Sequence, residues 1–77
     1  MLILTMSPTS KVVMVNGVPA RIWEGRTSGG VEVHAFVTRV CVSEKYPAEV
    51  HARFRKALQE TKKPSADVEG YPLRLIL

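Results

Sequence analysis

The chain has 77 residues, enough for a single small α+β domain over residues 1–77, and its 11 basic against 7 acidic residues give a net charge of +4. Its single cysteine, Cys41, excludes an internal disulfide and with it the disulfide-stapled class of secreted scaffolds. No stretch approaches the ~20 apolar residues of a membrane span, and the opening apolar run is too short for a signal peptide, so we expect a cytoplasmic protein.

The first part of the chain predicts a β-hairpin. Residues 1–10 are expected either to be flexible or to add an edge strand. The next five residues are rich in β-branched valine and are followed by Asn16-Gly17, the pair best suited to the positive φ angles of a two-residue type I′ turn. We therefore expect Val15 to pair with Val18 across this turn.

A second hairpin is predicted after the first. A turn-rich segment over residues 25–30 separates the return strand from a third strand expected over residues 31–42. The expected register pairs Glu24 with Val31. Apolar and polar residues stop alternating regularly near Thr38-Arg39, so a β-bulge or strong bend is expected there.

The last third of the chain predicts a helix and a final strand. Pro47 suits the first turn of a helix, and apolar residues follow at helical spacing, which predicts a helix from about Pro47 to Lys62. Residues 65–70 are expected to form a loop and residues 71–77 a last strand. The predicted fold is an antiparallel three- to four-stranded sheet with one amphipathic helix packed on one face, in the order β-β-β-α-β.

The two faces of this predicted sheet differ in composition. The expected register gathers small branched side chains on the face that the helix should cover: Val13, Val15, Ala20, Ile22, Val31, Val33, Ala35 and Val37. It gathers a mixture on the opposite face: Val12, Met14, Arg21, Trp23, Glu32, His34, Phe36 and Thr38. Aromatic side chains among polar and basic ones are typical of an interaction surface. The alternative is that residues 1–6 or the last strand cover this face.

Signals for chemistry are sparse. Cys41, His34 and His51 are the strong soft metal ligands and lack the paired short spacings of zinc sites. The glycines within residues 25–30 do not lead into a helix, as a phosphate-binding loop would. Cys41 and His34 could form a nucleophile and base, but no third orienting group is evident. We therefore expect no metal, no cofactor and no enzymatic activity.

Two resemblances accompany these patterns. The β-β-β-α order over residues 11–61 resembles the small DNA-binding domains at the N-termini of some phage-type integrases and of plant AP2 factors, at the level of element order only. The stretch from Val15 to Gly25, VNGVPARIWEG, resembles short uncharacterised proteins of bacterial and prophage genomes, a resemblance that implies no activity.

Two functions are compatible with these observations. The first is a non-enzymatic interaction module that self-associates as a homodimer, or binds a partner protein, through a sheet edge or the helix-free sheet face, because so small a domain buries little area. The alternative is a nucleic-acid-binding domain that uses the basic and aromatic sheet face, since a basic excess favours an anionic partner. The candidate binding residues are Arg21, Trp23, His34, Phe36, Arg39, Arg55 and Lys62.

Overall fold

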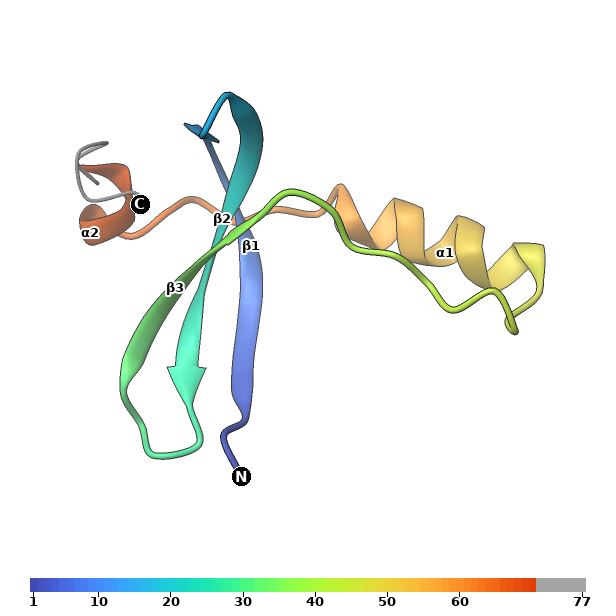
Figure 1. The fold of residues 1–77 in the computed structure, drawn as a ribbon, viewed down its shortest axis with the longest axis horizontal. Helices are drawn as coiled ribbons and strands as arrows, with labels where there is room; N and C mark the ends of the chain where they lie inside the picture. Colours follow the sequence, from blue (N-terminus) through green and yellow to red (C-terminus); the bar gives the residue numbers. More distant parts are fainter. Residues whose placement is uncertain (71–77) are drawn as a thin grey trace.

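A computed structural model describes residues 1–70 as a three-stranded antiparallel sheet with two helices (Figure 1). The elements in chain order are β1 (Leu4–Val15), β2 (Val18–Thr27), β3 (Glu32–Val37), α1 (Ala48–Leu58) and α2 (Ala66–Glu69). The strands lie side by side in the order β1-β2-β3. The predicted α+β class is confirmed, and the strand predicted over residues 71–77 lies outside the described residues. No helix within residues 1–70 is long and apolar enough to cross a membrane.

The first hairpin forms as predicted. Asn16 and Gly17 adopt φ angles of 50° and 80°, the two positive values that a type I′ turn requires. Val15 pairs with Val18, and Val13 pairs with Ala20. Local backbone preference is therefore sufficient to set the register of β1 against β2 next to the turn.

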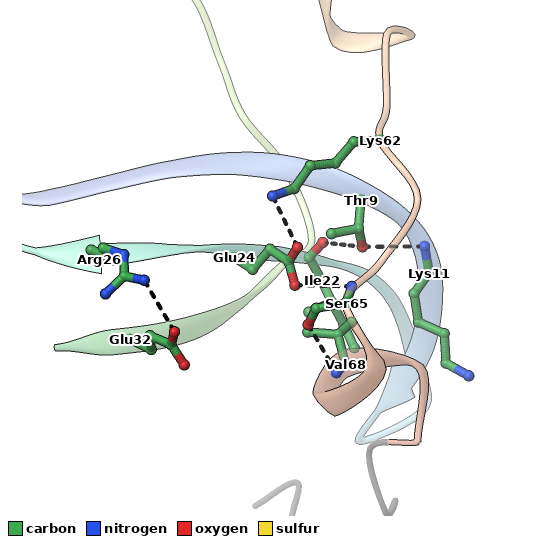
Figure 2. Close-up of polar contacts among 9 residues, drawn as sticks. All are labelled: Thr9, Lys11, Ile22, Glu24, Arg26, Glu32, Lys62, Ser65 and Val68. Atoms are coloured by element: carbon green, nitrogen blue, oxygen red, sulfur yellow. Dashed lines mark hydrogen bonds and ion pairs between the residues drawn. The ribbon is translucent and has the colours of Figure 1, made fainter.

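β1 begins well before the predicted hairpin strand and contains a bulge. The ladder with β2 is interrupted between Pro8 and Val12, where Thr9 and its two following residues lie opposite Ile22. The buried Thr9 hydroxyl donates to the Ile22 carbonyl over 2.7 Å and accepts from the Lys11 N–H over 3.2 Å (Figure 2). These hydrogen bonds satisfy polar groups that the interrupted ladder leaves unpaired.

The predicted register of the second hairpin is wrong. Glu24 pairs with His34, not with Val31, because β2 continues to Thr27 and the turn closes there. The Thr27 N–H donates to the Val31 carbonyl over 2.9 Å, and the Thr27 hydroxyl accepts from the Gly29 and Val31 N–H groups. The register shifts by an odd number of residues, so every β3 side chain changes face.

The shift corrects the predicted faces of β3. Phe36 pairs with Ile22 and joins the core face, whereas Ala35 and Val37 pair with Trp23 and Arg21 on the other face. Val31, predicted as core, is 61% exposed. The strand also ends at Val37, so the strand predicted to residue 42 and the bulge predicted at Thr38-Arg39 are wrong.

A short helix covers the core. Val68 of α2 packs on Ile22 and Val13, and both Val68 and Ile22 are completely buried. Ser65 caps α2 by accepting a hydrogen bond from the Val68 N–H over 3.4 Å (Figure 2). The prediction of a loop over residues 65–70 is therefore wrong: a capped turn of helix carries the residue that closes the core.

The longer helix α1 lies to the side of the sheet opposite α2 (Figure 1). It begins after Pro47 as predicted but ends at Leu58, before the predicted end at Lys62. None of its residues is buried, and its apolar residues Val50, Phe54 and Leu58 are only half-buried. The predicted packing of this helix over the core face is not confirmed.

Candidate functional site

Trp23 and Arg21 of β2 point to the side of the sheet opposite the core. Ile22 lies between them in the strand and is completely buried on the core side. Successive strand residues point to opposite faces, so its two neighbours share the other face. Pro8 of β1 is the ladder partner of Trp23, and Val37 of β3 is the partner of Arg21. This face therefore carries an indole and a guanidinium with apolar neighbours.

An open groove of about 430 Å³ lies over this face. The sheet forms its floor, and its walls are the segment after β3 and the C-terminal end of α1. We call it the arginine groove, and its lining residues are Pro8, Val12, Pro19, Arg21, Trp23, Val37, Thr38, Arg39, Val40, Arg55, Leu58 and Gln59. The position of α1 beside the sheet thus creates a hollow that the predicted packing would not have formed.

The charge of the arginine groove has one sign. Arg21, Arg39 and Arg55 contribute a positive charge each, and no acidic residue within residues 1–70 lines the groove. The Arg21 Nη1 donates to the Thr9 carbonyl over 2.9 Å, which anchors its guanidinium to the bulge of β1. Arg39 and Arg55 are exposed, and neither forms an ion pair with another described residue.

A second, polar cleft of about 280 Å³ lies on the core side of the sheet. Its lining residues are Glu24, Gly25, Arg26, Glu32, His34, Lys62, Ser65 and Asp67. It holds three carboxylates and mixed charges, in contrast to the arginine groove. The two hollows lie on opposite faces because Glu24 and Trp23 are adjacent in β2.

Glu24 is tied to the segment between the helices. Its Oε1 lies 2.9 Å from the Lys62 Nζ, and its Oε2 accepts from the Ser65 N–H over 3.4 Å (Figure 2). The pKa of the Glu24 carboxyl is lowered from its usual value, mainly by the hydrogen bond from Lys62. Burial acts in the opposite direction and raises this pKa. Both carboxylate oxygens of Glu24 therefore have a partner, and they join β2 to the segment between α1 and α2.

The seven candidate binding residues divide between the two faces. Arg21, Trp23, Arg39 and Arg55 come together in the arginine groove. The register shift of β3 removes two others from that face, since Phe36 packs against the core and His34 lines the polar cleft. Lys62 also lines the polar cleft, where it is paired with Glu24.

Several groove residues were missed by reasoning from the sequence. The sequence predicts Val37 on the core face and gives Pro8 and Pro19 no role in a site, yet all three residues line the groove. The sequence does contain a signal for the position of this turn, which is Thr27 shortly before two glycines. A hydroxyl at the end of a strand can accept hydrogen bonds from the N–H groups of the following turn. A turn closed at Thr27 would have placed Val37 beside Arg21.

A metal-binding constellation is not present within residues 1–70: no three histidine, cysteine or acidic side chains there gather closely enough to hold an ion. Comparisons of the chain with protein-family models, with curated proteins and with solved structures find no match.

Proposed function

We propose that this chain is a cytoplasmic, non-enzymatic interaction module that pairs with a second copy of itself through the outer edge of β1. Within residues 1–70 the buried apolar side chains are few: Val13, Ala20, Ile22 and Val68. A domain of this size has a thin margin of stability, and association is a common way for small domains to bury more apolar area.

The observation that carries the proposal is the orientation of the backbone at the start of β1. The Ile3 carbonyl accepts from the Ser28 N–H over 2.8 Å, so the backbone groups of Ile3 face β2. Backbone groups alternate sides along a strand, and those of Leu4 and Met6 therefore point away from β2. No other strand within residues 1–70 pairs with this edge at Leu4 or Met6.

The same edge already accepts an extended segment further along. The Lys62 N–H donates to the Pro8 carbonyl over 3.2 Å, and the Ser10 N–H donates to the Lys62 carbonyl over 2.9 Å. This short parallel bridge supports the outward direction of the edge. It occupies the edge from Pro8 onward and leaves the donors and acceptors of Leu4 and Met6 available.

The available edge lacks the features that normally prevent pairing. Proteins protect edge strands with charges, prolines, bulges or covering segments. Residues 2–7 contain no charged residue and no proline. The side chains of Leu2, Ile3 and Leu4 are between 49% and 71% exposed, so an apolar surface accompanies the open backbone groups.

A second copy of the chain is the occupant that this edge fits. In an antiparallel pair centred on Thr5, Leu4 of each copy lies opposite Met6 of the other. The N–H and carbonyl groups of these residues then match by two-fold symmetry. The two sheets join into one continuous sheet, and Leu4 of each copy lies beside Met6 of the other on the same face.

The test is the change Met6→Pro, compared with Met6→Ala. Proline removes the outward N–H of residue 6 but no hydrogen bond to β2, and an edge position of this kind tolerates proline. We expect light scattering to give the dimer mass for the wild-type protein and for Met6→Ala, and the monomer mass for Met6→Pro. Circular dichroism should show the same fold in all three.

Two results would contradict the proposal. One is a monomeric wild-type protein at the highest concentration that stays soluble. The other is a Met6→Pro variant that remains dimeric with the wild-type spectrum, which would place the interface elsewhere.

A further inference from the structure

We infer that the arginine groove binds single-stranded nucleic acid, with a base stacked on Trp23 and the phosphates held by Arg39 and Arg55. This binding function goes beyond self-association and uses a different part of the molecule, since Leu4 and Met6 do not line the groove. Charge, aromatic surface and size each point to this ligand.

The positive charge of the groove favours a polyanionic ligand. Arg39 lies on the segment after β3, and Arg55 lies in the last turn of α1, so the two cations stand on the walls of the groove. A guanidinium carries several N–H donors in a planar fork that matches phosphate oxygens. The carboxylates of Glu24, Glu32 and Asp67 line the polar cleft on the other face and do not oppose an anion here.

The floor of the groove favours a ligand with a planar apolar group. Trp23 is half-buried in the sheet and lines the groove together with Val12 and Val37. Nucleic-acid bases stack on aromatic side chains with about 1–3 kcal/mol per base. An acidic peptide would satisfy the arginines but would offer no regular partner for the indole, and for this reason a nucleic acid fits better.

The size of the groove favours a single strand over a duplex. A volume of about 430 Å³ lies in the range of small-ligand pockets, ~300–1,000 Å³, and is suited to a base with its attached sugar and phosphate. In a duplex the bases are stacked inside the helix, and reaching Trp23 would require extrusion of a base at a cost of a few kcal/mol. A single strand offers its bases without this cost.

Trp23 is the single tryptophan of the chain, so tryptophan fluorescence reports directly on binding in the groove. We would titrate the protein with oligothymidylate and with oligouridylate, and follow the fluorescence of Trp23. Saturable quenching by either oligonucleotide is expected, and their relative affinities distinguish DNA from RNA as the source. A blunt duplex and polyglutamate serve as competitors, and both are expected to bind at least about tenfold more weakly, since neither offers an unstacked base.

A matched pair of double variants tests the placement of the site. Arg39→Ala with Arg55→Ala removes two groove cations. Arg53→Ala with Lys56→Ala removes two exposed cations of α1 that do not line the groove. The slope of log K against log salt concentration is negative, and for the groove variant it should be less steep by about 1.4, because each phosphate contact of a single strand contributes about −0.7. The control variant should keep the wild-type slope.

The inference is overturned if neither single strand quenches Trp23 at low salt. It is equally overturned if duplex or polyglutamate binds as tightly as the single strands, or if the two double variants lose affinity to the same extent. The last result would mean that net charge alone governs binding.

Discussion

Gly25 of β2 lies directly against the backbone of Thr5 in β1. A Cβ atom on Gly25 would overlap the Thr5 carbonyl oxygen and would lie 2.7 Å from the Met6 Cα. Only a residue without a side chain fits at this position. The close approach lets β2 continue into the turn-rich segment over residues 25–30 as far as Thr27, and the end of β2 in turn sets where β3 pairs.

The change Gly25→Ala should therefore destabilise the fold. Its methyl group would meet main-chain atoms, so we expect a loss of about 1–3 kcal/mol or more in the free energy of unfolding. The control is Gly29→Ala, whose Cβ would meet only the Thr27 hydroxyl at 3.8 Å, an ordinary contact. Urea unfolding followed by circular dichroism measures both. Equal midpoints for the two variants would show that the strands do not approach closely at Gly25.

The position of the core gives a second prediction. Val68 is completely buried, whereas the larger Phe54 on α1 is only half-buried. Val68→Ala should cost about 1.5–3 kcal/mol through lost burial and the cavity it leaves. Phe54→Ala should cost less, although phenylalanine is the larger side chain. The reverse order in thermal unfolding would mean that α1, and not α2, covers the core.

The ion pair of Glu24 with Lys62 gives a prediction about pH. Because the pKa of Glu24 is lowered in the folded chain, the pair stabilises the fold above the unfolded pKa of about 4.3, and this contribution is lost as pH falls through the lowered folded value. Lys62→Met should reduce the free energy of unfolding near pH 7 by at most about 1 kcal/mol, since the Lys62 side chain is half exposed. The difference from the wild-type protein should disappear at acidic pH.

The control for this change is Lys63→Met, which removes the same charge from the next residue. Lys63 is exposed and forms no ion pair with the described residues. Urea unfolding at a series of pH values should show no pH-dependent difference for Lys63→Met. A Lys62→Met difference that persists unchanged below the folded pKa would contradict the assignment to the ion pair.

The candidate site was predictable where local rules apply. The opposite orientations of Trp23 and Ile22 follow from strand alternation next to the turn at Asn16-Gly17, and this part of the prediction is confirmed. The placement of His34 and Phe36 beside Trp23 was wrong because it depended on where a second turn closes. If the predicted pairing after that turn is wrong by an odd number of residues, every side chain of the following strand is assigned to the wrong face of the sheet.

The sequence by itself determined the elements whose cause is local. A positive-φ pair makes the first turn, a proline precedes α1, and alternation orients β2 about Ile22. Only the tertiary structure decided that Gly25 belongs inside a strand, that Val68 closes the core, and that α1 stands beside the sheet to form the arginine groove. These outcomes depend on contacts between residues that are far apart in the chain. The spacing of apolar residues within one segment does not determine which distant segment will pack against it.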